Sequence, residues 1–166
     1  QFLFESSLII CTTLVLGGII LLIVDRMKFE PRYHDVMDIS PLTALKIGAC
    51  QCLALIPGVS RSGSTITAGR ALSYTREAAA RFSFLLSIPA VVLSGLFSLK
   101  DVGGGNGVPV GPTLVATVVS FVVGYAAIAW LLRYLTSHTL VIFVVYRVAL
   151  GLLLFALLAG NVIEAR

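Results

Sequence analysis

Charged residues are scarce in this sequence: Asp, Glu, Lys and Arg make up only 12% of its 166 residues, whereas 58% are hydrophobic. A soluble domain carries about 25% charged residues, so this composition excludes an ordinary water-soluble protein. Charge is absent altogether from residues 6–24, 82–99, 102–132 and 148–163. Because a helix of about 20 apolar residues crosses a bilayer, the sequence predicts an all-α, polytopic membrane bundle that forms a single transmembrane domain over residues 1–166.

Patterns that bind metals or nucleic acids are also missing. Cys11, Cys50 and Cys52 form no CxxC pair, and neither His34 nor His138 has another ligand type at helical spacing, so we assign no metal to these residues. The net charge of +4 is spread along the chain instead of gathering on one face, which argues against nucleic acid as a partner.

Proline, glycine and capping residues divide the chain into helices. We expect membrane spans over residues 4–24, 76–99, 112–132 and 139–160, with a flexible linker at 100–112. Between the first two spans, one short helix begins at Ser40–Pro41 and stops at Pro57–Gly58, and a second begins at Ser62–Ser64 and runs to about residue 73. Each is too short to cross, so we predict a re-entrant hairpin over residues 40–74. The alternative is one kinked span.

Arginine and lysine residues at the ends of these segments predict the orientation. Arg26, Arg70, Arg76 and Arg133 all lie at such ends, and the positive-inside tendency places them on the cytoplasmic side. The hairpin then enters and leaves from the cytoplasm, and the linker at 100–112 faces outside.

The stretch "LIPGVSRSGSTITAG", residues 55–69, places polar side chains between apolar segments. Arg61 offers a planar fork of donors that matches phosphate oxygens, and the following helix directs its unpaired N–H groups toward the same loop. Hydroxyls and small residues surround it, namely Ser60, Ser62, Ser64, Thr65, Gly58 and Gly63. The pattern favours a phosphate site, although a polar turn with a snorkelling arginine has the same composition.

Arg147 is a second arginine within an apolar segment, about eight residues into the last span. A charge at that depth should face the bundle interior and find partners. We expect a buried structural anchor, and the alternative is a second phosphate contact.

Three stretches together resemble a known family. "QCLALIPGVSRSGSTITAG" at residues 51–69, "FSFLLSIPAV" at 82–91 and "YRV" at 146–148 closely resemble the undecaprenyl-pyrophosphate phosphatase family, also called bacitracin-resistance proteins. The resemblance extends from about residue 40 onward and is loose over the first span. The pattern Pro-Gly-x-Ser-Arg-Ser-Gly-x-Thr is far more specific than a lone glycine-rich loop.

This resemblance implies a hydrolase of the bacterial cell membrane that removes the terminal phosphate of undecaprenyl pyrophosphate, a polyprenyl lipid substrate. The product, undecaprenyl phosphate, is the recycled lipid carrier for peptidoglycan and cell-wall synthesis. The family fold has two inverted repeats, each with a re-entrant hairpin. By resemblance, Arg61, Ser60 and Thr65 are the catalytic residues, and Ser62, Gly63, Ser64 and Gly58 bind substrate. A divalent cation, Mg or Ca, is expected, with ligands outside this chain.

The sequence departs from the family in one respect. The family's first signature has a pair of glutamates followed by a Pro-x-Ser-Ser-x-Gly-His run, and this run is absent here. Gln51 stands where this hairpin mirrors one of those glutamates. We therefore expect the C-terminal portion of a longer enzyme, inactive without the N-terminal repeat, and an oligomer is compatible with the sequence.

Two other functions fit the same residues. A polyprenyl-phosphate transporter or flippase without hydrolysis would also use broken helices and an arginine loop. A purely structural membrane subunit is the third alternative, but it leaves Arg61 unpaired in the membrane. A glutamate pair and a histidine beside a serine-rich loop would favour hydrolysis.

Overall fold

The computed structural model describes residues 7–27, 33, 35–101 and 109–160. Four of its helices are long and apolar enough to cross a membrane: α1 (Ser7–Arg26), α4 (Arg76–Ser98), α5 (Val110–Leu135) and α6 (Val141–Ala159). Two shorter helices lie between the first pair, α2 (Pro41–Gln51) and α3 (Arg61–Ala71). Three 3-10 turns complete the list: η1 (Val36–Asp38), η2 (Cys52–Leu55) and η3 (Leu99–Asp101). The predicted all-α polytopic membrane fold is confirmed.

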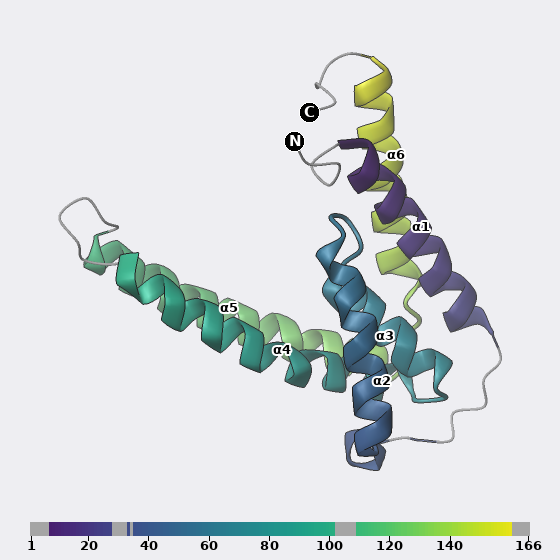
Figure 1. The fold of residues 1–166 in the computed structure, drawn as a ribbon, viewed down its shortest axis with the longest axis horizontal. Coiled ribbons are helices and arrows are strands. Elements are labelled where there is room, and N and C mark those ends of the chain that lie inside the picture. The colour runs from purple at the N-terminus through teal and green to yellow at the C-terminus, as the bar shows by residue number, and fades with distance from the viewer. Residues whose placement is uncertain (1–6, 28–32, 34, 102–108, 161–166) are drawn as a thin grey trace.

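The helices form two regions (Figure 1). In the first, which we call the body, α1 lies along α6, α3 packs against α1, and α2 packs against α3. In the second, which we call the arm, α4 and α5 run side by side and extend away from the body. Small residues let α1 and α6 approach closely, because a Cβ added at Gly151 would lie 2.7 Å from Val15 Cγ2.

The first short helix, α2, forms where its capping residues predict it. The Ser40 side chain accepts a hydrogen bond from the Thr43 N–H at 3.2 Å, and Pro41 occupies the first turn of α2. One prediction was wrong: Ser60 caps α3, instead of a residue between Ser62 and Ser64. The helix begins earlier because a turn with positive φ at Ser60 brings its hydroxyl to the Gly63 N–H. Re-entry of the hairpin from one membrane side stays a prediction.

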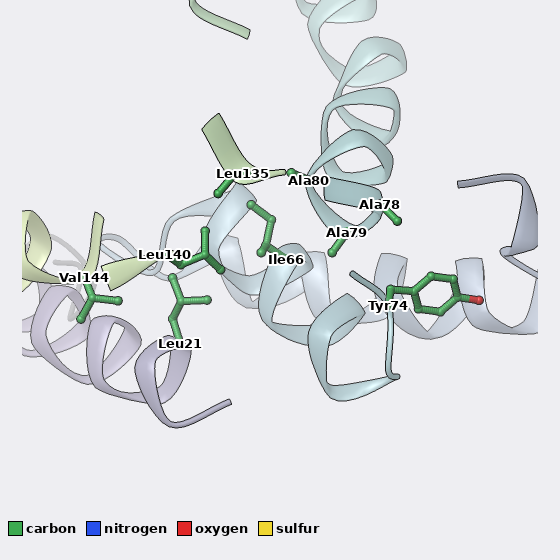
Figure 2. Close-up of a cluster of buried hydrophobic side chains, with 9 residues drawn as sticks. All are labelled: Leu21, Ile66, Tyr74, Ala78, Ala79, Ala80, Leu135, Leu140 and Val144. Carbon is green, nitrogen blue, oxygen red and sulfur yellow. The ribbon is translucent and has the colours of Figure 1, made fainter. Parts of the chain in front are cut away.

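The buried apolar core lies at the junction of the body and the arm (Figure 2). Leu21 of α1 and Ile66 of α3 meet the beginnings of α4 and α6 there. The other members are Tyr74, Ala78, Ala79, Ala80, Leu135, Leu140 and Val144. Among the residues of α5, only Leu135 is buried, so the arm is joined to the body at one end.

A buried carboxylate lies beside this core. The side chain of Asp25, at the end of α1, is only 1% exposed. Its Oδ1 is 2.7 Å from Arg76 Nε and 3.3 Å from Arg70 Nε, and its Oδ2 accepts from the Leu140 N–H at 3.5 Å. The ends of α1 and α3 therefore meet the starts of α4 and α6. The placement of these arginines on the cytoplasmic side stays a prediction.

Candidate phosphate-binding site

The loop between η2 and α3 has an unusual backbone at its last residue. Ser60 has φ 38° and ψ 115°, a region that a side chain with a Cβ rarely occupies. In this conformation the Ser60 hydroxyl accepts a hydrogen bond from the Gly63 N–H at 3.1 Å. The loop therefore turns sharply into α3 and presents the first turn of that helix, where N–H groups have no partners within the helix.

Arg61 opens α3 and is exposed. Among the residues that the structure describes, none forms a hydrogen bond or an ion pair with its guanidinium group. The Ser62 hydroxyl lies 3.4 Å from that of Ser60. The loop thus presents a guanidinium group, two hydroxyls and a helix N-terminus together, an arrangement that favours an anion.

The other two predicted hydroxyls make contacts within the protein. Ser64 Oγ donates to the Arg61 carbonyl at 2.9 Å. Thr65 is 1% exposed, and its Oγ1 lies 2.7 Å from Ser83 Oγ on α4. The structure therefore brings Ser60, Arg61, Ser62 and Gly63 together at the loop, whereas the Thr65 hydroxyl joins α3 to α4.

Two cavities adjoin the loop, and Arg147 lines both. The larger, of about 250 Å³, is bordered by Ser60, Ser62 and Gly63 and by apolar side chains that include Phe84 and Phe143. The smaller, of about 180 Å³, lies against Gly17, Ser64 and Thr67. A polar wall on an otherwise apolar cavity suits a ligand with a charged head and an apolar tail.

Arg147 faces the bundle interior and has a partner there, as the sequence predicted. Its Nη2 donates to the Gly58 carbonyl at 3.0 Å. Space for the guanidinium comes from two glycines, because a Cβ added at Gly63 would lie 2.6 Å from Nη1 and one at Gly17 would lie 2.8 Å from Nη2. Arg147 therefore connects α6 directly to the tip of the hairpin.

Sequence reasoning missed a second contact at the same tip. Thr13 Oγ1 of α1 lies 2.6 Å from the Pro57 carbonyl, its nearest acceptor. Gly58 fits against this part of α1 with φ 88°, and a Cβ there would collide with Thr13 Oγ1 and approach the Ile10 carbonyl to 2.7 Å. Nothing in the local pattern of the first span distinguishes Thr13 from its neighbour Thr12.

The described residues hold no group of three or more His, Cys, Asp and Glu side chains that fits a metal ion. The buried carboxylate of Asp25 is paired with two arginines, and Glu77 is paired with Arg81 at 2.8 Å. A ligand set for a divalent cation is therefore not present in this part of the chain.

The fold defines a class: a multi-pass, all-α membrane protein with a polar loop between two short helices. Residues 1–153 match the family model described as bacitracin resistance protein BacA. The chain belongs to this family, and is thus a protein of the bacterial cell membrane.

Curated relatives carry a more specific name. An undecaprenyl-diphosphatase of a Nocardioides species is 52% identical over 163 residues, which are 98% of this chain and 59% of the relative. Undecaprenyl-diphosphatase 3 of Frankia alni is 52% identical over 178 residues, 98% of this chain and 60% of the relative. An undecaprenyl-diphosphatase of Thermobifida fusca is 45% identical over 160 residues, which are 96% of this chain and 54% of the relative. The chain thus spans little more than half the length of the relatives it matches.

Proposed function

We propose that this chain supplies the phosphate-binding half of an undecaprenyl-diphosphatase, which removes the terminal phosphate of undecaprenyl pyrophosphate to give undecaprenyl phosphate and phosphate. The observation that carries the proposal is the loop at residues 57–63, where an exposed Arg61 stands beside the strained Ser60 cap. The names of the curated relatives favour hydrolysis over lipid transport. Recycling of the lipid carrier for the cell wall follows from this activity.

Each loop residue has a distinct part in the proposal. Phosphoryl transfer depends mainly on positioning and on stabilising negative charge on the equatorial oxygens. The Arg61 fork and the first N–H groups of α3 bind those oxygens, and the hydroxyls of Ser60 and Ser62 add donors. Gly63 and Gly58 allow close approach of the backbone. The Ser64 hydroxyl supports the turn through the Arg61 carbonyl, and Thr65, catalytic by the family resemblance, holds α3 against α4 through Ser83.

The groups that activate water and transfer protons belong, in this proposal, to the part of the relatives that the chain does not cover. The family resemblance implies a glutamate pair and a histidine there. A divalent cation, Mg or Ca, would neutralise phosphate charge, and its ligands would come from the same part, since the described residues offer no ligand set. This chain, residues 1–166, is then one repeat of an inverted pair, and its hairpin over residues 40–74 re-enters the membrane.

Release of phosphate from polyprenyl diphosphate in detergent tests the function. The assay compares this 166-residue chain with a protein that has the full length of the relatives. We expect turnover by the longer protein and none above a detergent blank by the 166-residue chain. A transporter breaks no diphosphate bond and would give no release from either protein, and that result would overturn hydrolysis. Release by the 166-residue chain would mean that its own carboxylates supply the chemistry.

A further inference from the structure

Two consecutive carbonyls at the hairpin tip are held by two different helices. The Pro57 carbonyl accepts from Thr13 Oγ1 of α1 at 2.6 Å, and the Gly58 carbonyl accepts from Arg147 Nη2 of α6 at 3.0 Å. Neither acceptor lies inside a helix, so neither is satisfied by regular structure. In a low-dielectric surrounding, such carbonyls need partners, and α1 and α6 supply them.

The Thr13 hydroxyl has a choice of acceptors. Besides the Pro57 carbonyl, the Ile9 carbonyl lies at 2.8 Å and the Ile10 carbonyl at 3.1 Å, both in its own helix. A hydroxyl has one proton to donate, and the Pro57 oxygen is the nearest acceptor. A threonine inside a helix ordinarily bonds back to its own helix, as Thr12 does to the Leu8 carbonyl at 2.7 Å. Thr13 therefore differs from Thr12 by reaching the loop.

The contact between Thr13 and Pro57 lies three residues before Ser60, the strained cap of α3. Ser60 keeps φ 38° only if its surroundings fix the chain on both sides, because such a conformation costs about 1–3 kcal/mol. On the helix side the Gly63 N–H fixes it. On the other side, Gly58, with φ 88°, packs directly against Thr13 and Ile10 of α1. The direction in which Arg61 leaves the loop thus depends on α1.

We propose that Thr13 is a positioning residue for the phosphate loop, acting through the Pro57 carbonyl. The predicted effect on kcat rests on the proposed function, whereas the predicted effect on the structure of the loop does not. Thr13 touches no reacting atom. Its hydroxyl fixes the tip of the hairpin. The Ser60 turn, the first N–H groups of α3 and the Arg61 side chain thereby keep the relative positions needed to bind one phosphate group.

Three variants of the full-length protein test this role. Thr13→Val has the same shape but places a methyl where the Pro57 carbonyl needs a donor. We expect kcat to fall about tenfold or more, because small displacements of a positioned group are costly, with KM changed less than about threefold. Thr13→Ser restores the hydroxyl and should recover kcat to within about threefold. Thr12→Val, the matched control, should retain wild-type values.

Hydrogen exchange of the backbone N–H groups at residues 58–63 gives a second measurement that needs no activity. Thr13→Val should exchange faster in this loop than wild type, Thr13→Ser and Thr12→Val should not, and exchange in α4 should be unchanged. If Thr13→Val does not fold, Thr13→Ala removes the same donor without the extra bulk. Wild-type exchange and kcat in Thr13→Val, or equal damage in Thr13→Ser, would overturn the proposal. A wild-type protein that releases no phosphate would overturn the enzyme function alone, while the exchange data still decide on Thr13.

Discussion

The body and the arm use the same apolar residue types in opposite ways. In the body, the tip of the hairpin is fixed by polar side chains from α1 and α6, and where the body meets the arm Asp25 binds Arg70 and Arg76. In the arm, α5 buries only Leu135, and the buried residues of α4 all lie between Ala78 and Ser83. Apolar helix surface against lipid carries no penalty, so the arm does not need protein contacts to be stable in a bilayer. Precision in the body therefore depends on a few polar contacts.

The largest effect should follow from breaking the buried ion cluster. Asp25→Asn leaves Arg70 and Arg76 without their carboxylate, and loss of one partner from a buried pair costs about 3–5 kcal/mol. We expect that decrease in the free energy of unfolding in mixed micelles. The matched change on the arm is Glu77→Gln, which removes an exposed pair with Arg81 and should cost about 0.5 kcal/mol or less. Equal costs for the two variants would contradict the contrast between the regions.

A pair of isoleucine truncations compares the packing of the two regions. Ile47 of α2 is 1% exposed, whereas Ile88 of α4 is 53% exposed. Ile47→Ala should lower the free energy of unfolding by about 2–5 kcal/mol, because it leaves a cavity. Ile88→Ala should lower it by less than about 1 kcal/mol in the same micelles, since detergent takes the place of the lost side chain. A large loss for Ile88→Ala would show that protein, not lipid, covers this part of the arm.

The next effect concerns the guanidinium fork at the loop. In the full-length enzyme, Arg61→Ala and Arg61→Lys should each lose at least about a hundredfold in kcat, as for loss of a principal oxyanion donor. Phosphate release is the measurement. Arg81→Lys, a similar exchange at an exposed arginine of the arm, is the control and should retain turnover. Near-normal turnover of Arg61→Lys would mean that charge alone is sufficient.

A smaller effect is expected for Arg147, the anchor from α6. Arg147→Gln leaves the Gly58 carbonyl without its donor, which should destabilise the protein by about 1–3 kcal/mol. Inhibition by inorganic phosphate separates an anchor from a direct phosphate ligand. An anchor leaves the inhibition constant within about threefold of wild type, whereas a lost ligand weakens it tenfold or more. The second result, with normal melting, would place Arg147 in the phosphate site.

Local signals predicted most of the fold. Ser40 with Pro41, and Thr75 before α4, cap helices as their residue types suggest. The early start of α5 at Val110 is compatible with Pro112, because proline is tolerated in the first turn of a helix. These boundaries depend on hydrogen bonds between near neighbours in the chain, which is why they can be read from the sequence.

The site was less predictable because its geometry depends on distant residues. The residue types at the loop indicated an anion, but the cap at Ser60 depends on Gly58 being seated against α1. The partner of Thr13 is 44 residues away, and that of Asp25 on α4 is 51 residues away. Helical periodicity relates residues three or four positions apart, so it gives no signal for either of these pairs. For Arg147 alone, its position deep in an apolar span predicted from the sequence that it would have a partner inside the protein.

The Asp25 cluster also sets an order for biosynthesis. Arg76 follows Asp25 by 51 residues, and Leu140 follows it by 115. At about 5–20 residues per second, a ribosome completes these intervals in about 3–10 s and 6–23 s. The carboxylate can therefore be neutralised by Arg76 well before α6 emerges to lie along α1. During that interval Thr13 of α1 is available to the hairpin tip but Arg147 of α6 has not yet been made, so both contacts of the loop at residues 57–63 can form only once α6 is complete.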